Sequence, residues 1–400
     1  MADNKDKKVL NVPHLRFPEF SGEWEEHTLS EYLEFKNGLN PDAKRIGNGL
    51  PFISVMDVLS EGVIRYDNIR GKVDATEKEI ECFGVKNGDI LFQRSSETLE
   101  DVGRANVYMD DRTAIYGGFV IRGRKIGNYD PMFFKFLLAT PLARKSTCRM
   151  GAGAQHFNIG QEGLSKISLF FPHIEEQRKI ASLLSLIDQR IATQNKIIED
   201  LKLLKSAIIE STYYNRSYHP CRIGDVIEQI SERNKDKSID MVLSVSNKQG
   251  FINQSEQFED RIIASEDTSN YKIVHKNDFA YNPARINVGS IARLTTIEMG
   301  IVSPMYICFR VRKGVVSEYL EHFFSTSYFF YEMQKRLEGS VRQCLSFESI
   351  CNIPIYIPSS EEQHTIGKKI SVLLDKIDIE THYHCKLVEQ KHYLLRQMFI

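Results

Sequence analysis

Two short polar segments carry side chains of the kinds that hydrogen-bond to nucleic-acid bases and phosphates. Each segment directly follows a β-rich run and combines arginine with asparagine, glutamine or serine. Arginine pairs with guanine, asparagine and glutamine pair with adenine, and arginine and serine contact phosphates. The candidate contact residues are Arg94, Ser95, Ser96 and Arg104 in the first segment and Asn282, Arg285, Asn287 and Arg293 in the second. The alternative for both segments is a solvated surface loop.

A second pair of segments, 149–156 and 335–343, combines basic or amide side chains with glycine. Glycine permits the backbone to approach a phosphate closely, and amide and basic side chains can reach base edges. The candidate contact residues here are Gln155, His156, Arg342 and Gln343. The alternative is the ordinary end of a helix, where a basic residue and a glycine cap are common.

The sequence predicts no catalytic residue and no metal ligand. Asn282-Pro283-Ala284-Arg285 shares only its first two residues with the Asn-Pro-Pro-aromatic motif of amino-methyltransferases, and it lacks the aromatic residue that stacks on a flipped base. The chain also lacks the glycine-rich phosphate-binding motif of ATPases. His382 and His384 point to different faces of a helix, so they are a poor pair of metal ligands.

The elements that must position these segments recur along the chain. The segment Phe171-Pro172-His173-Ile174-Glu175-Glu176-Gln177 corresponds to Ile357-Pro358-Ser359-Ser360-Glu361-Glu362-Gln363, with a numbering offset of 186 from Pro172 to Pro358. Towards the N-terminus the offset grows, to 188 between Phe119–Arg124 and Ile307–Arg312 and to 194 between Leu29 and Ile223. Differences in loop length between equivalent elements produce such a drift. We therefore predict two tandem halves, each a globular region followed by a helix.

The predicted fold class is α+β, with two β-rich α/β domains in tandem, separated by two long antiparallel coiled-coil helices. Runs such as Gly88–Phe92 and Ser303–Phe309 are typical of strands, whereas Pro131–Thr140 and Glu318–Tyr331 have the pattern of amphipathic helices with aromatic residues in the core. The predicted boundaries are 1–20 for an N-terminal lead-in, 21–172 and 217–358 for the domains, and 173–216 and 359–400 for the helices.

Both long helices carry an apolar seam with a seven-residue period. The predicted pairing residues are Ile180, Leu184, Ile187, Ile191, Ile198 and Leu201 in the first helix and Ile366, Ile370, Leu373, Ile377, Leu387 and Leu394 in the second. A polar residue interrupts each seam at the same register, Gln194 and Glu380. Such a residue either fixes the register of pairing or faces water where the helices diverge.

Composition limits the class of protein. The chain of 400 residues has a net charge of -1, which excludes a uniformly cationic nucleic-acid binder but permits a basic face balanced by acidic surface. Its seven cysteines are scattered without a Cys-x-x-Cys pair, which is typical of reduced thiols in the cytosol. Because no apolar run is long enough to span a membrane, we predict a cytoplasmic protein without membrane association.

The opening segment and the repeated junction resemble those of a known family. Val12-Pro13-His14-Leu15-Arg16-Phe17-Pro18-Glu19-Phe20, followed by Gly22-Glu23-Trp24, and the twofold Pro…Glu-Glu-Gln entry into a long helix resemble the specificity subunit of Type I restriction–modification enzymes. The resemblance covers essentially the whole chain. It implies a non-catalytic DNA-reading subunit, in which each globular domain is a target recognition domain for one half of a split site and the helices set the spacing.

The resemblance also implies partners. These are double-stranded DNA, two methyltransferase subunits docked on the helices, and restriction subunits that join this core. S-Adenosylmethionine and ATP are expected on the partner subunits, so no cofactor is assigned to this chain. Two alternatives stay open: a fragment of a fused restriction–methylation enzyme with its own catalysis, and a coiled-coil scaffold without a role at DNA. Methyl transfer by the purified chain would indicate the first, and a missing sequence-dependent footprint the second.

Overall fold

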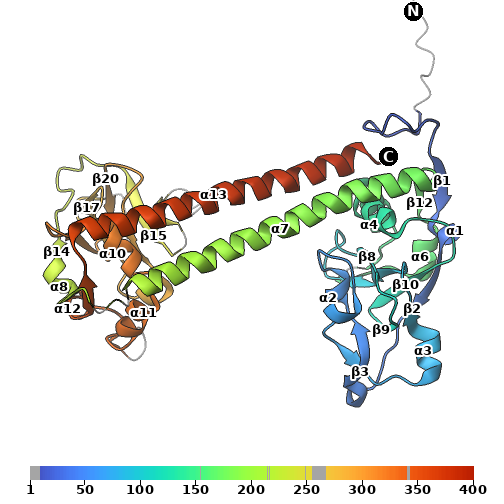
Figure 1. The fold of residues 1–400 in the computed structure, drawn as a ribbon, viewed down its shortest axis with the longest axis horizontal. Helices are drawn as coiled ribbons and strands as arrows, with labels where there is room; N and C mark the ends of the chain where they lie inside the picture. The colour runs from blue at the N-terminus through green and yellow to red at the C-terminus, as the bar shows by residue number, and fades with distance from the viewer. Residues whose placement is uncertain are drawn as a thin grey trace, which may run out of the picture. The chain divides into compact units, whose positions relative to one another are not determined.

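The computed structural model describes residues 10–153, 155–213, 215, 217–247, 249–254, 267–339 and 343–400. The chain divides into two compact units. The first contains the residues up to 195 together with 383–400, and the second contains 196–382. Each unit therefore holds one β-rich domain, part of helix α7 (Ile174–Tyr213, green in Figure 1) and part of helix α13 (Ser360–Gln397, red).

Short strands and helices build the domain of the first unit. Its strands are β1 (Glu25–Thr28), β2 (Leu33–Asn37), β3 (Ile46–Ile53), β4 (Lys72–Val73), β5 (Gly84–Val85), β6 (Ile90–Gln93), β7 (Ser95–Ser96), β8 (Ala105–Val107), β9 (Ala114–Tyr116), β10 (Val120–Lys125), β11 (Phe157–Asn158) and β12 (Ser168–Phe171). Its shorter helices are α1 (Leu29–Tyr32), α2 (Val55–Val58), α3 (Glu77–Phe83), α4 (Pro131–Ala139), α5 (Pro141–Arg149) and α6 (Gln161–Ser165). Two four-stranded sheets, β2-β10-β6-β8 and β4-β3-β9-β5, form its framework, and β1 pairs with β12.

The second unit repeats this topology. Its strands are β13 (His219–Arg222), β14 (Ile227–Ile230), β15 (Val242–Ser246), β16 (Gly250–Asn253), β17 (Lys272–His275), β18 (Phe279–Tyr281), β19 (Ile291–Arg293), β20 (Met299–Val302), β21 (Ile307–Val311) and β22 (Pro354–Ile357). Its shorter helices are α8 (Ile223–Val226), α10 (Ser317–Phe323), α11 (Ser327–Gln334) and α12 (Phe347–Cys351). The sheets β14-β21-β18-β19 and β16-β15-β20-β17 and the pair β13-β22 have the strand order of the first unit, and β15–β20 is parallel as β3–β9 is. The predicted tandem repeat is confirmed.

Strand registers correct one step of the sequence alignment. Arg124 of β10 lies opposite Glu34, and Arg310 of β21 lies opposite Glu228 at the equivalent position of the second unit. The two strands therefore correspond at an offset of 186, from 124 to 310, and not at the predicted 188. The prediction was wrong because the offset of 188 aligns Arg122 and Arg124 with Arg310 and Arg312, whereas the observed offset aligns only Arg124 with Arg310.

Two predicted elements differ from the observed ones. Helix α4 agrees with its prediction to within one residue, but Glu318–Tyr331 forms two helices, α10 and α11. Thr326 separates them because its hydroxyl caps α11, accepting a hydrogen bond from the Phe329 N–H at 3.0 Å. Strand β21 begins only at Ile307, because residues 303–306 form a turn.

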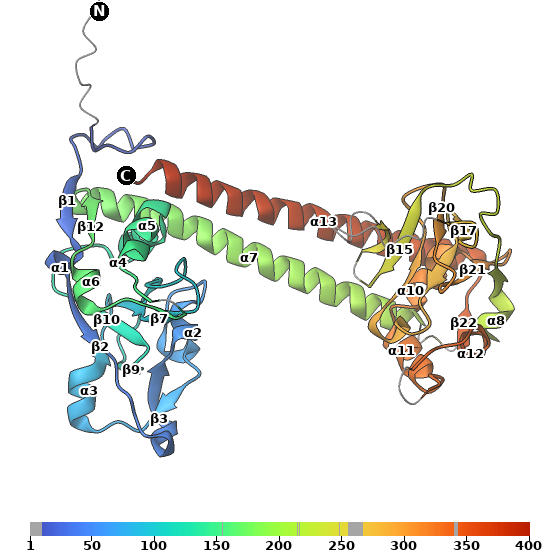
Figure 2. The same ribbon diagram turned by 180° about the vertical axis from the view of Figure 1, so that it is seen from behind.

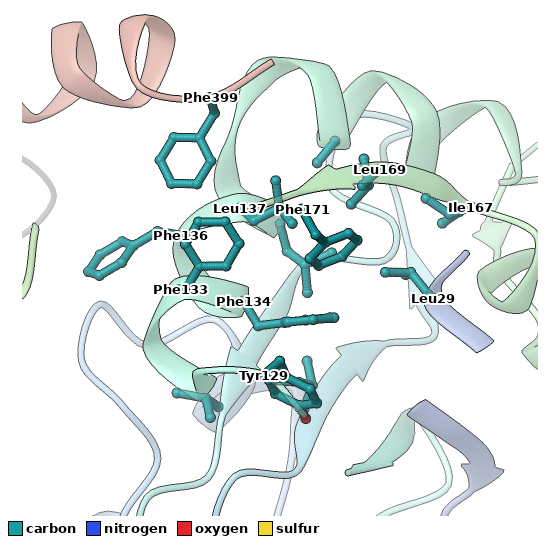
Figure 3. Close-up of a cluster of buried hydrophobic side chains, with 14 of the residues drawn as sticks. Leu29, Tyr129, Phe133, Phe134, Phe136, Leu137, Ile167, Leu169, Phe171 and Phe399 are labelled. Carbon is teal, nitrogen blue, oxygen red and sulfur yellow. The ribbon is translucent and has the colours of Figure 1, made fainter. Parts of the chain in front are cut away.

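Aromatic side chains fill the core of the first unit (Figure 3). Phe133, Phe134 and Phe136 of α4 are buried, and the rings of Phe134 and Tyr129 have centroids 4.2 Å apart. Phe399, just beyond the end of α13, stacks on Phe133 at 5.4 Å. The aromatic residues expected in the core do lie there, and residues from both ends of the chain complete it.

The predicted seam residues of α7 and α13 are buried or half-buried, and most of their neighbours along each helix are exposed. In the first unit Ile180 and Leu184 of α7 share one core with Leu394 of α13. In the second unit Ile209 of α7 shares a core with Ile370 of α13. Helix α7 thus begins in the first unit and ends in the second, whereas α13 begins in the second and ends in the first (Figure 2).

The polar seam position of α7 is enclosed, and that of α13 is half-buried. Gln194 is 5% exposed, so the interpretation that it faces solvent is excluded. In the first unit Lys391 of α13 forms an ion pair with Asp188 of α7 at 2.6 Å. In the second unit Glu380 is half-buried and pairs with Lys376 of its own helix.

A buried glutamine lies in the first turn of each long helix and explains the repeated Pro…Glu-Glu-Gln sequence. Gln177 donates from Nε2 to the Pro172 carbonyl at 2.9 Å and accepts from the N–H of Asp130, the N-cap residue of α4, at 3.1 Å. Gln363, its equivalent in the second unit, makes the same two contacts at 3.0 and 2.7 Å. In each unit one amide therefore joins the last strand, the long helix and the start of α4 or α10.

The N-terminal segment packs against the end of α13 within the first unit. The Leu15 N–H donates to the Gln397 carbonyl at 2.8 Å. Arg16 binds the buried carboxylate of Glu176 through two hydrogen bonds of 2.8 and 2.7 Å, a bidentate arrangement of the strong kind. The first unit is thus closed by segments from both ends of the chain.

Replacing Gln177 or Gln363 with methionine, which has similar length but no amide, should destabilise the chain. Each substitution leaves a buried carbonyl and a partly buried N–H without their partner, which costs about 2–4 kcal/mol of unfolding free energy. Urea unfolding followed by circular dichroism measures the loss. Glu175→Gln and Glu361→Gln, at exposed positions two residues earlier, are matched controls with an expected change below about 0.5 kcal/mol. Equal stability of the methionine variants and their controls would contradict this role.

Candidate nucleic-acid interface

In the first unit the two predicted contact segments lie side by side. Strand β7 (Ser95–Ser96) pairs with β11 (Phe157–Asn158), and the Ser95 hydroxyl bonds to the Asn158 side chain at 2.5 Å. The Ile159 N–H donates to the Arg94 carbonyl at 3.0 Å, which extends the contact. The loop after β6 and the segment after α5 therefore form one surface, although they are far apart in the sequence.

A short hairpin presents the second of these segments. Ala152 and Asn158 exchange two backbone hydrogen bonds of 2.9 Å, which close the hairpin. Gly153 has φ +146°, and a Cβ there would collide with the carbonyl oxygen of His156. Gln155 and His156 are exposed between the two ends of the hairpin, where they can meet a ligand.

The second unit builds the same hairpin at the equivalent place. Glu338 and Cys344 exchange backbone hydrogen bonds of 2.9 and 2.8 Å, and Gly339 has φ +105°. Gln343 is exposed. Arg342, the other predicted contact residue of this segment, lies outside the described residues.

The loop between β18 and β19 lies against this second hairpin. The Leu345 N–H donates to the Pro283 carbonyl at 3.0 Å, and the Tyr281 hydroxyl donates to the Leu345 carbonyl at 3.2 Å. Within the loop Arg285 is exposed and Asn287 is half-buried. Both units thus place a strand-end loop next to a hairpin, with different residues on each.

Two predicted contact residues have structural roles instead. Arg293 is 11% exposed, and its guanidinium donates to Glu321 at 2.9 Å and to the Asn277 side chain at 2.7 Å. Asn282 is 6% exposed, and its side-chain oxygen accepts from the Ala284 N–H at 3.0 Å, which holds the turn. These contacts do not favour the predicted role in base contact, and residue type and position after a strand do not reveal such burial.

The arginines of the first segment form only weak interactions with the rest of the chain. Arg94 is half-buried and donates from Nη1 to the Gly118 carbonyl at 3.3 Å. Arg104 forms an ion pair with Asp101 at 2.7 Å, but both side chains are well exposed. Exposed ion pairs contribute little to stability, so this one can be exchanged for a phosphate contact at small cost.

A buried aspartate anchors the strand that carries each loop. Asp89 accepts from the Lys86 N–H at 2.9 Å and from the Lys125 N–H at 3.0 Å, and burial raises the pKa of its carboxyl group. Asp278, the equivalent residue, binds Arg310 through hydrogen bonds of 2.6 and 2.8 Å. The turns before β6 and β18 are thus fixed from within, so the loops that follow these strands start from a rigid base.

Sequence reasoning missed two exposed apolar residues beside these loops. Phe119 is 68% exposed and Met305 is 57% exposed. They occupy the same position of the turns before β10 and β21, because they share the offset that relates Arg124 to Arg310. The two-residue slip in the sequence alignment placed Phe119 and Met305 at different positions, so their equivalence was not recognised. A single apolar residue in a turn also does not indicate from sequence whether its side chain is exposed.

A cleft of about 720 Å³ in the first unit lies apart from the interface, since no predicted contact residue lines it. Its walls include Lys135, Asp188 and Lys391. Burial lowers the pKa of Lys135 to about 8, and Asp188 and Lys391 neutralise one another as an ion pair. We assign no ligand to this cleft.

Residues 21–203 and 215–387 each match the family described as Type I restriction modification DNA specificity domain. The chain belongs to this family. The type I restriction enzyme MjaVIII specificity subunit of Methanocaldococcus jannaschii is 21% identical over 419 residues, which cover 94% of this chain and 91% of that protein. The double match of the specificity family agrees with the repeated topology of the two units.

Two solved structures share the specificity-family fold. The S subunit of the Type-I restriction-modification system from M. genitalium superposes with a TM-score of 0.57 at 15% identity, covering 97% of this chain and 99% of that chain. A chain from a structure titled "Structural basis underlying complex assembly and conformational transition of the type I R-M system" gives 0.59 at 12% identity, covering 94% and 97%. At these identities the likeness shows the fold alone.

Membership of the DNA specificity family assigns the chain to DNA recognition and not to catalysis. Among the described residues, no group of three or more His, Cys, Asp or Glu side chains is placed to hold a metal ion. The same residues contain no helix with the length and apolar character needed to cross a membrane.

Gly153→Ala should disable the first hairpin. The added methyl group would collide with the His156 carbonyl and would strain a backbone conformation that L-residues rarely adopt, at a cost of about 1–3 kcal/mol. We expect faster amide hydrogen exchange in residues 152–159 and at least about tenfold less binding to target DNA in the complex with partner subunits. The control is Gly160→Ala, where the new Cβ meets nothing within 4 Å. Identical behaviour of the two variants would show that the hairpin is not part of the interface.

Proposed function

We propose that the chain is the specificity subunit of a Type I restriction–modification complex and reads a bipartite DNA target, one half-site per domain. One observation carries this proposal: the same loop-and-hairpin surface is built twice on the same strand order, with different residues at the surface. A repeated framework gives both domains the same mode of docking. Different side chains on the framework give each domain its own sequence preference.

The two long helices support a fixed spacing between the half-sites. Each is uninterrupted, with 40 residues in α7 and 38 in α13, and at 1.5 Å per residue such a helix is about 60 Å long. The seam keeps its seven-residue period along both helices, which is typical of helices that pair along their length. Two readers joined by helices of this length would leave an unread spacer between the sequences that they contact.

The helices also offer two equivalent docking surfaces for partner subunits. Leu186 is 56% exposed and its equivalent Val372 is 61% exposed; Ile197 is 38% exposed and its equivalent Tyr383 is 43% exposed. Exposed apolar side chains that recur in this way mark interaction sites. Both pairs share the offset of the Pro…Glu-Glu-Gln junctions, so each helix carries one copy of the same exposed surface. We assign one methyltransferase subunit to each of these two surfaces. We assign the restriction subunits to the complex of this chain with its methyltransferase subunits.

The near-neutral net charge of the chain is consistent with DNA binding as part of a complex with partner subunits. With 52 basic and 53 acidic residues, the chain alone lacks the excess of cations that gives tight binding to phosphates. We assign much of the phosphate binding to the methyltransferase subunits. S-Adenosylmethionine and ATP are likewise assigned to the partner subunits, and the complex is assigned to the cytoplasm.

Exchanging residues 25–155 for those of a relative with a different target should change one half of the recognised sequence and leave the other half unaltered. The exchanged segment carries the first loop and the first hairpin only as far as Gln155, and it leaves the second unit intact. Methylome sequencing of a host that expresses the chimaera with its partner subunits gives the target directly. The reciprocal exchange of the second domain is the control. If both half-sites changed, or neither did, the assignment of one half-site to each domain would be wrong.

Lengthening both helices by seven residues should lengthen the unread spacer. Seven residues preserve the seam register and add about 10 Å, close to the rise of three base pairs. Insertion after Gln194 and after Glu380 places the added residues at equivalent points of α7 and α13. Methylome sequencing should report unchanged half-sites separated by about three more base pairs. An unchanged spacer would show that the helices do not set the spacing.

A further inference from the structure

One turn in each unit carries a large apolar side chain into solvent. In the first unit the Val120 N–H donates to the Gly117 carbonyl at 2.9 Å, and the equivalent bond in the second unit is 3.0 Å. Phe119 and Met305 occupy the third position of these two equivalent turns. Single apolar residues are common on protein surfaces. Their recurrence at equivalent positions, each beside a contact loop, calls for a specific explanation.

The turn that carries Phe119 is held on both sides. On one side the Arg94 N–H donates to the Phe119 carbonyl at 2.9 Å. On the other side the Leu39 N–H donates to the Tyr116 carbonyl at 2.9 Å, and the side chain of Asn40 fills the space where a Cβ of Gly118 would lie. The ring of Phe119 therefore projects from a rigid base, directly beside the loop of Arg94 and Ser95.

Different residues hold the equivalent turn of the second unit. Pro304 restricts the backbone at the second position of the turn, and Lys272 donates from Nζ to the Tyr306 carbonyl at 2.7 Å. Pro283 stands where the first unit has Arg94 and has no N–H to donate, so the bond that supports Phe119 has no counterpart here. The residues that support the turn differ between the two units, whereas both units have an exposed apolar side chain at its third position.

We propose that Phe119 and Met305 are apolar wedges that contact the bases of the first and second half-sites, respectively. This assignment rests on the proposed function, because it requires each domain to face DNA. Aromatic rings and thioethers can stack on bases, meet thymine methyl groups or enter between base steps, and these contacts involve no phosphate. The polar loop beside each turn then supplies hydrogen bonds to neighbouring base edges. Because Phe and Met differ in shape, the wedges favour different base steps in the two half-sites.

Alanine variants of the chain, assembled with its methyltransferase partners, test this role on a duplex that carries the target identified by methylome sequencing. Phe119→Ala should bind this duplex about tenfold more weakly than the unmodified chain and bind an unrelated duplex equally well. The slope of log affinity against log salt should not change, because no phosphate contact is lost. Met305→Ala should behave in the same way. Fluorescence anisotropy over a salt series measures all three quantities.

Exposed apolar residues away from the turns provide matched controls. Ile126, 59% exposed beyond the far end of β10, and Met299, 42% exposed at the start of β20, should each tolerate alanine without loss of specific binding. Scrambling the first half-site should reduce the affinity of the unmodified chain more than that of Phe119→Ala. Since Phe119 and Met305 are exposed, their alanine variants should keep the thermal unfolding midpoint of the unmodified chain.

The outcomes separate the two proposals. If the unmodified complex binds its target and an unrelated duplex equally, the proposed function itself fails. If the unmodified complex is specific and Phe119→Ala binds like Ile126→Ala, only the wedge assignment fails. Loss of affinity for both duplexes, or a changed salt slope, would also overturn the wedge, because it would place Phe119 in general DNA binding.

Discussion

The architecture of each unit depends on one buried amide at the start of a long helix. Gln177 and Gln363 each hydrogen-bond to the strand that ends the domain and to the N-cap residue of the helix α4 or α10. A domain cannot turn about the start of its helix without breaking one buried and one partly buried hydrogen bond, which are costly to leave unmade. The contact loops and hairpins are built on the same domain framework. Their orientation relative to the first turns of the helix is therefore set by these two side chains.

Backbone conformation and the candidate DNA contacts depend on different residues of this framework. The Asp89 and Asp278 anchors and the glycines of the two hairpins are repeated, and they determine the path of the backbone. The side chains that face outwards differ, with Gln155 and His156 on one hairpin and Gln343 on the other. Exposed residues can change at little cost in stability, whereas buried anchors cannot. Because different residues carry the two roles, the DNA sequence preference of a domain can change while its fold stays the same.

The sequence predicted the features that depend on periodicity and repetition. The seam of α7 and α13, the duplicated domains and the Pro…Glu-Glu-Gln junction all leave a regular pattern, because buried positions recur with the period of the helix or with the length of the repeat. The sequence did not predict the features that depend on burial of a side chain at a single position. Arg293 and Asn282 have the chemistry of base readers but are enclosed by Glu321 and by their own turn. The slip between β10 and β21 arose because Arg122 and Arg124 match Arg310 and Arg312 at the wrong offset, and strand pairing alone reveals the correct one.

The discontinuous composition of the first unit has a consequence for biosynthesis. Residues 196–382 form the second unit as one unbroken stretch, whereas the first unit also needs residues 383–400, including Phe399 against Phe133 and Gln397 against Leu15. On the ribosome the second unit can fold as soon as its own residues have emerged. The amino-terminal domain, although synthesised earlier, has an incomplete apolar core until the final helix is released. This domain therefore completes its folding last, which reverses the usual order in which N-terminal domains fold first during synthesis. Chaperone protection is then needed at the amino-terminal part of the nascent chain.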